Sequence, residues 1–401
     1  MTGAMASLLP VAGLAASVIE YPIAGSSLEG VASGPDGNLW LTDAGQNAID
    51  RFTLAGQVTV YKLPTTNALP VDITMGPDNN LWFNEENQIV NHLGRITKDG
   101  TITEFPTDSG QVVGIATGSD GNLWFNERDN FAVAKMTTAG FVTHYLIPGG
   151  INGGPNPSAD PIGITAGPDG NLWVTDESEN VIWKVTTAGV FTKYQLPFSN
   201  PLPGNPSGNR GANAITTGAD GNLWIGEASQ NSIGRMTRKG VLTEFPIPIA
   251  NAGMAGIQAG PDGNVWFTEM NADQVAMITP SGTITEIPIP TASSLPRRPA
   301  SGPNGRVWFP EGVGNLAEVV DFPAPPKVGW SQRPRAGSTM SPPNQPWYVA
   351  PTAPPVGKGP GGGGSIPQTA TPATSHAPRA WTSNAVLVAQ ILRAMAQLAT
   401  F

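Results

Sequence analysis

Short stretches of alternating apolar and polar residues recur along most of the chain, separated by turn signals. In residues 255–287, a small-residue stretch at 255–259 precedes the turn 261–264, and apolar stretches follow at 265–268, 274–278 and 283–287. Period-2 alternation with turn residues about every 8–12 positions is typical of short antiparallel strands. Gly and Asn accept the positive φ that tight hairpin turns need. The pattern predicts an all-β fold built from four-stranded units.

One phrase with a tryptophan at its centre occurs seven times. Examples are GPDGNLWLTD at 34–43 and GPDGNVWFTE at 260–269. The spacings between successive tryptophans are 42, 42, 49, 51, 42 and 42 residues. The seven residues are Trp40, Trp82, Trp124, Trp173, Trp224, Trp266 and Trp308. A four-stranded repeat of about 42 residues fits a propeller blade, so we predict a seven-bladed β-propeller over residues 17–322.

The seventh unit lacks a fourth strand. Its third strand, 315–320, runs directly into the proline-rich segment that starts at Phe322. The missing strand lies at the other end of the chain, because residues 18–23 (VIEYPI) match residues 242–247 (LTEFPI). We expect this N-terminal strand to pair with 315–320 and close the ring, which leaves no open sheet edge. A ring closed in this way does not need to oligomerise, so a monomer is expected.

Charge divides the chain into an acidic body and a basic tail. The 401 residues include 13% charged ones, carry a net charge of −9 and contain no cysteine. Residues 323–401 contain basic side chains and no acidic one. The absence of cysteine excludes disulfides, thiol chemistry and cysteine-bound zinc, and an acidic body disfavours nucleic acid as a partner. No uninterrupted apolar stretch is long enough to predict a transmembrane segment.

Both ends of the chain are predicted to lie outside the propeller. Residues 1–16 resemble either the second half of a secretory signal, which would favour an extracytoplasmic location, or a frayed terminus. Residues 323–382 are rich in proline and glycine, which predicts a disordered linker. Residues 383–401 have apolar residues at helical spacing behind a cap at Ser383 or Asn384, which predicts a short amphipathic helix. This helix either docks loosely or binds a partner.

Three phrases of the repeat together resemble a known family. They are NLWIGE at 222–227, NSIGRMT at 231–237 and GVLTEFPIP at 240–248. Over about residues 17–322 the chain resembles the virginiamycin B lyase (streptogramin lyase) family. The resemblance implies a seven-bladed propeller. It also implies an antibiotic-resistance enzyme that opens a cyclic depsipeptide by elimination at its ester bond, using magnesium.

The residues that carry this activity in the family are not all present. The resemblance implies catalytic histidines on the inner strands of the last two blades, and a glutamate just after the last blade's tryptophan. Ala255 and Arg297 occupy the histidine positions, Leu295 replaces another inner acid, and Glu311 lies one residue out of register. Arginine stays protonated in proteins and cannot act as a general base. We therefore expect the family's catalytic machinery to be absent.

The histidines and the repeated acids are predicted to be structural. His92, His144 and His376 are predicted to be solvated residues away from the propeller centre. An acid follows each tryptophan by three residues, and five third strands contain a base. The acids are Asp43, Glu85, Glu127, Asp176, Glu227, Glu269 and Glu311, and the bases are Arg51, Arg95, Lys135, Lys184 and Arg235. We predict a hydrogen-bonded network of acids and bases within each blade rather than a ring of metal ligands.

The residue eleven positions before each tryptophan is predicted to lie at the mouth of the central channel. In blades one and seven these residues are Glu29 and Arg297, and Asp72 and Arg298 add charge one position later in blades two and seven. Blades one and seven are neighbours in a closed ring, so we predict an ion pair between Glu29 and Arg297. The functional alternative is an anion or carboxylate site formed by Arg297 and Arg298, because guanidinium groups bind carboxylates bidentately.

Two longer connections, residues 148–161 and 197–213, precede blades four and five on the same face. Long loops on a rigid scaffold are where binding residues usually lie. Asp160, Asn209, Arg210 and Asn213 are the polar residues expected to face the channel mouth.

These observations leave three functions open. The one we favour is a propeller that binds a small molecule or peptide at its upper face without turnover, and it requires no cofactor. The second is a magnesium-dependent carbon–oxygen lyase in which Glu29, Asp72 or Glu311 acts as the base, with a pKa raised by burial. The third is a scaffold that recruits a partner through its tail. The missing histidines separate the first function from the second.

Overall fold

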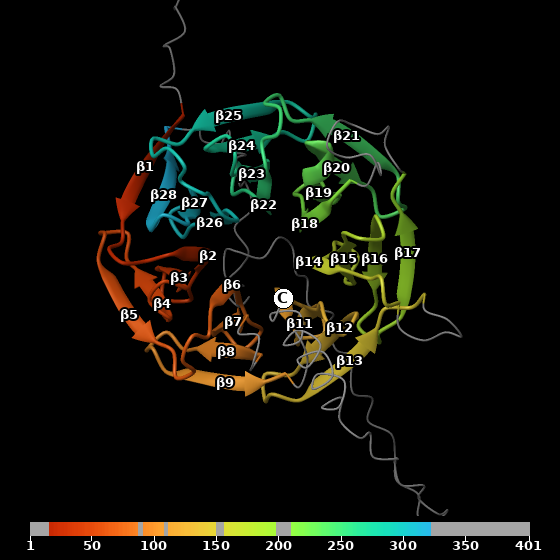
Figure 1. Ribbon diagram of the computed structural model, residues 1–401, viewed down its shortest axis with the longest axis horizontal. Helices are drawn as coiled ribbons and strands as arrows, with labels where there is room; N and C mark the ends of the chain where they lie inside the picture. The colour runs from red at the N-terminus through yellow and green to blue at the C-terminus, as the bar shows by residue number, and fades with distance from the viewer. Residues whose placement is uncertain (1–15, 87–90, 108–110, 150–155, 198–209, 322–401) are drawn as a thin grey trace, which may run out of the picture. The chain divides into compact units, whose positions relative to one another are not determined.

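The described residues of the computed structural model form seven four-stranded antiparallel sheets around a common axis (Figure 1). The structure describes residues 16–86, 91–107, 111–149, 156–197 and 210–321. All of them belong to one compact unit. The predicted seven-bladed β-propeller is confirmed. The N-terminal segment before residue 16, the predicted linker 323–382, the predicted helix 383–401, Asn209 and His376 lie outside the described residues.

Each blade is a meander of four strands that runs from the axis to the rim (Figure 1). The first strands are β2 (Leu28–Ser33), β6 (Pro70–Met75), β10 (Val112–Thr117), β14 (Pro161–Ala166), β18 (Ala212–Thr217), β22 (Met254–Ala259) and β26 (Ala300–Ser301). The second strands are β3 (Leu39–Asp43), β7 (Leu81–Glu85), β11 (Leu123–Glu127), β15 (Leu172–Asp176), β19 (Leu223–Glu227), β23 (Val265–Glu269) and β27 (Val307–Glu311). All residues of the second strands are buried, which places the core at the blade interfaces.

The outer half of each blade is more exposed. The third strands are β4 (Ala48–Phe52), β8 (His92–Ile96), β12 (Ala132–Met136), β16 (Val181–Val185), β20 (Ser232–Met236), β24 (Gln274–Ile278) and β28 (Asn315–Val320). The fourth strands are β5 (Val58–Lys62), β9 (Ile102–Pro106), β13 (Val142–Leu146), β17 (Phe191–Gln195), β21 (Leu242–Pro246), β25 (Ile284–Pro288) and β1 (Ser17–Pro22). One short 3₁₀ turn, η2 (Ala228–Gln230), also occurs among the described residues. No helix in this part of the chain is long and apolar enough to cross a membrane.

The ring is closed by the first strand of the chain, as predicted. β1 pairs antiparallel with β28, from Ser17 opposite Val320 to Pro22 opposite Asn315. Tyr21 of β1 packs against Trp308 with a ring-centroid separation of 5.5 Å. The N-terminal strand thereby supplies the outer edge of the last blade.

The repeated phrase around each tryptophan forms a hairpin turn that is hydrogen-bonded to the indole. In every blade the indole Nε1 donates to the side-chain oxygen of the turn residue four positions earlier, at 2.9–3.1 Å. The glycine six positions before the tryptophan lies under the indole ring. A Cβ added at Gly260 would lie 2.3 Å from Cδ1 of Trp266, so only glycine fits there. The indole hydrogen bond and the close glycine hold the hairpin turn against the tryptophan, which is buried between blades.

The prediction that the third-strand bases pair with the repeated acids is wrong. Arg95 instead forms an ion pair with Asp78 of the turn at 3.6 Å, and Lys184 does the same with Asp169 at 2.9 Å. The register explains the error, because Arg95 lies directly opposite Trp82. An acid three positions after the tryptophan has the opposite strand parity, so its side chain lies on the other face of the sheet.

Candidate functional site

The upper face is the face of the propeller at which the first strands begin, and two charged pairs lie there. The residues ten positions before the tryptophans are small in five blades; the complete set is Gly30, Asp72, Gly114, Gly163, Ala214, Gly256 and Arg298. The two charged members bind each other, with Nη1 of Arg298 2.9 Å from Oδ2 of Asp72. Blade one lies between their blades. A Cβ added at Gly30 would lie 2.5 Å from the carbonyl oxygen of Val71, so the backbones pack closely beneath this pair.

The second pair joins blades seven and one, as the sequence predicted. Arg297 Nε lies 3.0 Å from Oε2 of Glu29, and its Nη2 donates to Oε1 at 3.2 Å. Burial raises the pKa of Glu29, and the adjacent guanidinium of Arg297 counteracts part of that rise. The pair is thus an ion pair with one hydrogen bond, from Nη2, while Nε lies close to the carboxylate without donating to it.

The local sequence explains why arginine side chains lie at this position. The first strand of blade seven, β26, has only two residues, because Pro299 cannot donate a backbone hydrogen bond at the position where Ile257 of blade six pairs with the second strand. Arg297 N still donates to the carbonyl oxygen of Pro310 at 2.8 Å. The two arginine side chains thus link the shortest inner strand to blades one and two.

Further charged groups continue around the upper face in blades two to four. Glu86 accepts a hydrogen bond from Gln111 at 3.1 Å, and burial together with the charges of Asp72 and Glu29 raises its pKa. Arg128 binds Asp160 through two bonds of 2.6 and 2.9 Å. These residues occupy equivalent places at the ends of second strands or the starts of first strands, and they form one charged sector.

A shallow hollow adjoins this sector between blades three and four. Its volume is about 500 Å³, and Arg128, Asp129, Phe131, Ser158 and Asp160 line part of it. Asp160 therefore lies on the upper face as predicted, with its carboxylate held by Arg128. A ligand-binding role for Asp160 stays a prediction.

The opposite sector, in blades five and six, has no charged side chain at the equivalent positions and is mainly apolar, with Asn213 as a polar exception. Ala228, Ala255 and Met270 are half-buried there, and Sδ of Met270 lies 3.8 Å from Nη1 of Arg297. Ala255 occupies a position where the sequence resemblance implies a histidine. The upper face is therefore amphipathic, with acids and arginines on one side and small or thioether side chains on the other.

Two of the predicted ligand-binding residues have structural contacts instead. Arg210 is 2% exposed, donates to the carbonyl oxygen of Pro197 at 2.6 Å and contacts Glu227 and Glu244. Its side chain is held inside blade five. No pattern in the repeat predicts this contact, because Arg210 precedes Glu227 by 17 residues and follows a long connection between blades.

Asn213 bridges blades five and six. In four other blades a Thr or Asn two residues after the tryptophan donates to a carbonyl of the next inner strand, at 2.6–3.0 Å. Blade five has Gly226 at that position, and Asn213 donates to the carbonyl oxygen of Met254 at 3.4 Å instead. A search for the missing Thr or Asn in the repeat would have revealed this role.

The seven repeated acids are fully buried inside the blades, on the sheet face away from the third-strand bases. Each finds a different partner or none. Glu311 accepts from Nδ2 of Asn315 at 2.8 Å, while burial and the charge of Glu20 raise its pKa to about 7. Its partners lie in the outer strands of blade seven, so its carboxylate is not part of the upper-face cluster. Glu29 and Asp72 of the predicted bases do lie in that cluster, each held by an arginine.

Both histidines of the described residues lie away from the propeller centre, as predicted, and each contacts one of the repeated acids. Nδ1 of His144 lies 2.9 Å from Glu127, and Nδ1 of His92 lies 3.3 Å from Glu85. The His92 side chain is only 14% exposed. The prediction of solvated histidines is therefore wrong for His92, because its strand register places it directly opposite the buried Glu85. Neither histidine belongs to an inner strand.

The upper face does not fit a magnesium ion. Magnesium prefers several oxygen ligands in near-octahedral geometry. The carboxylates of Glu29 and Asp72 are bound by Arg297 and Arg298, whose positive charges occupy the place of a cation. Within the described residues, three potential metal donors come together only in blade two, at Glu85, His92 and Glu104.

The fold and the site define a seven-bladed propeller with an amphipathic upper face and, in the described part of the chain, no histidine on that face. The chain belongs to the virginiamycin B lyase family, whose sequence profile matches residues 11–153 and 155–321. No curated protein sequence matches the chain.

Solved structures agree with this family assignment. A streptogramin B lyase structure is 31% identical, with a TM-score of 0.68, and the match covers 76% of this chain and 97% of that one. A catalytically inactive histidine-to-alanine variant of virginiamycin B lyase from Staphylococcus aureus, solved with quinupristin, is 30% identical, with a TM-score of 0.68 and coverage of 76% and 99%. The extracellular domain of a hybrid two-component system from B. thetaiotaomicron, at 16% identity and a TM-score of 0.57, shares the fold alone.

Proposed function

We propose that this chain is a ligand-binding member of the virginiamycin B lyase family that does not catalyse ring opening. The observation that carries the proposal is the pair of residues at the family's histidine positions. Ala255 has no group that transfers a proton, and Arg297 is permanently protonated and engaged by Glu29. Glu29 and Asp72 are each held by an arginine, so neither is free to serve as the general base.

The chemistry of the upper face indicates an amphipathic ligand. Glu29, Asp72 and Glu86 place carboxyl groups on one side, the first two paired with Arg297 and Arg298, while Ala255 and Met270 offer apolar contact on the other. Pockets that combine apolar walls with a few convergent polar groups are typical of small-molecule sites. Quinupristin, which is present in a related solved structure, is the first probe to use.

Ring opening is tested by incubating the full chain with quinupristin and Mg²⁺. Elimination breaks a carbon–oxygen bond within the ring, so the linear product keeps the mass of the substrate. Liquid chromatography with fragment-ion analysis separates the two species. We expect only the cyclic compound after prolonged incubation. A new peak with the same mass and linear fragments would contradict the proposal.

Binding is tested by titration calorimetry with the same compound, without Mg²⁺. We expect saturable binding that weakens when Met270→Asp places a charge on the apolar sector. Phe141→Ala is the matched control, because Phe141 is 75% exposed in the turn before β13 at the outer side of blade three. Absence of binding, or equal losses in both variants, would refute a ligand site on the upper face.

A further inference from the structure

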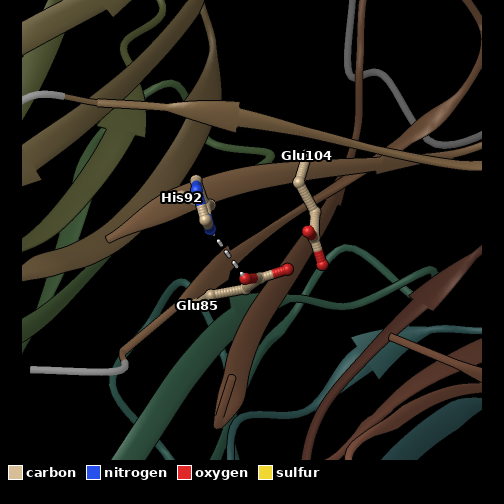
Figure 2. A group of neighbouring side chains, drawn as sticks. All are labelled: Glu85, His92 and Glu104. Atoms are coloured by element: carbon tan, nitrogen blue, oxygen red, sulfur yellow. Dashed lines mark hydrogen bonds and ion pairs between the residues drawn. The ribbon is translucent and has the colours of Figure 1, made fainter. Parts of the chain in front are cut away.

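Three potential metal donors meet inside blade two, away from the upper-face cluster. Glu85 ends β7, His92 begins β8 directly opposite it, and Glu104 lies on β9 (Figure 2). Gly94 is paired with Glu104 across the sheet and has no side chain to separate the two carboxylates. One donor atom from each residue lies within 4.8 Å of the others.

The central carboxylate of this group lacks a partner on one side. Glu85 is 0% exposed, and its Oε2 contacts Nδ1 of His92 at 3.3 Å. Its Oε1 has no hydrogen-bond partner and points toward Glu104, as Figure 2 shows. Leaving a buried carboxylate oxygen without a donor is costly. Glu104 accepts hydrogen bonds from Thr65 N at 3.0 Å and from Thr65 Oγ1 at 2.9 Å, so the unpartnered atom that a cation between the two carboxylates would satisfy is Oε1 of Glu85.

The equivalent place in blade five contains a cation from the chain itself. Glu227 and Glu244 correspond to Glu85 and Glu104 in the repeat, and both contact the guanidinium of Arg210. Among the described residues no arginine contacts Glu85 of blade two, and the third donor there is the imidazole of His92. Because the same geometry takes a positive charge in blade five, blade two can take one from solution.

We propose that Glu85, His92 and Glu104 form a binding site for one divalent transition-metal ion of the zinc class. Imidazole together with carboxylates suits Zn²⁺ and Co²⁺, whereas magnesium prefers oxygen ligands alone. Zinc ligands lie at about 2.0–2.2 Å from the ion, so donor atoms on one ion are roughly 3–4 Å apart. Small side-chain movements bring the three donors to that separation. The ion would brace the second, third and fourth strands of the blade.

Co²⁺ is the probe, because its visible absorption reports coordination directly. We expect the full chain to bind one equivalent more than the His92→Ala variant, or to bind the ion at least about tenfold more tightly. Alanine is a mild change here, since Ala48 and Ala132 begin the third strands of blades one and three. His144→Ala is the matched control, because the Glu127–His144 pair offers only two donors and its loss should leave the site unchanged.

A gain-of-site variant provides the complementary test. Blade six has Glu269, Glu286 and Gln274 at the three equivalent positions. Gln274→His should therefore add a second equivalent of Co²⁺ with similar absorption. Equal binding by the unmodified chain and His92→Ala, or absence of an added equivalent in Gln274→His, would overturn the proposal. Because neither measurement uses the upper face, the result is independent of quinupristin binding.

Discussion

Glu269 in blade six offers a quantitative test of how this fold tolerates buried acids. It ends β23, is 0% exposed, and neither of its carboxylate oxygens has a hydrogen-bond partner. Burial, followed by the charge of Glu286, raises the pKa of Glu269 from 4.5 to about 8. At neutral pH the folded protein therefore keeps a proton on Glu269 that the unfolded chain has lost. Glu269→Gln removes this group from the titration with little change of shape.

The sign and the magnitude follow from proton linkage. Between the unfolded pKa of 4.5 and the folded value of about 8, the folded state binds one more proton than the unfolded state. The stability that this proton contributes is present below pH 4.5 and is lost as the pH rises through about 8. Each pH unit in this window costs about 1.4 kcal/mol. The free energy of unfolding of Glu269→Gln, taken relative to that of the unmodified chain, should therefore be about 3 kcal/mol higher at pH 7 than at pH 5.

Urea unfolding at pH 5, 6 and 7, followed by tryptophan fluorescence, measures this gain. Glu227→Gln is the control: Glu227 is bound by Arg210 at 3.2 Å and Ser232 at 2.8 Å. Its replacement leaves Arg210 with a weaker partner and should destabilise the protein across the whole range. Parallel pH profiles for Glu269→Gln and the unmodified chain would refute the assignment of a bound proton to Glu269.

Two further predictions concern the packing of a glycine under a tryptophan and the ion pair between blades seven and two. Gly260→Ala should lower the free energy of unfolding by about 1–3 kcal/mol, because the added Cβ would lie 2.3 Å from the indole of Trp266. Thermal unfolding measures this loss, and an unchanged melting temperature would contradict the prediction. A double-mutant cycle on Arg298→Ala and Asp72→Ala should give a coupling energy of about 1 kcal/mol, because the pair is only partly exposed; additive effects would show that the pair contributes nothing.

The fold could be predicted because its signals are local and repeated. The turn before Trp266 needs a side-chain oxygen at Asp262 for the indole and a glycine at Gly260 beneath it; the glycine recurs in every blade, and the acceptor is an aspartate in six blades and Asn304 in the seventh. Closure was predictable for the same reason, since a β1 sequence that matches another blade's fourth strand has only one place left to pair. The pairing of Glu29 with Arg297 then followed from the neighbouring positions of blades seven and one.

The missed contacts depend on strand parity and on loops. Arg95 and Glu85 lie close in the repeat, yet they occupy opposite faces of the sheet, so the predicted network does not form. Arg210 enters blade five from a loop whose path the repeat does not specify. His92 looked like a rim residue, although its register places it against a fully buried acid. Counting parity from the tryptophan would have corrected the first and third errors; nothing local would have corrected the second.

Two arginines on the upper face stabilise the inner edge of the last blade. Blade seven has the shortest first strand, because Pro299 removes a backbone donor directly after its two arginines. Backbone pairing is therefore weakest at the inner edge of the blade that the N-terminal strand completes. Arg297 and Arg298 compensate by binding carboxylates of blades one and two. A histidine at either position is too short and too weakly charged to make both contacts. Under the proposed function, the arginine that stands where the resemblance implies a histidine therefore also strengthens the inner side of the closure.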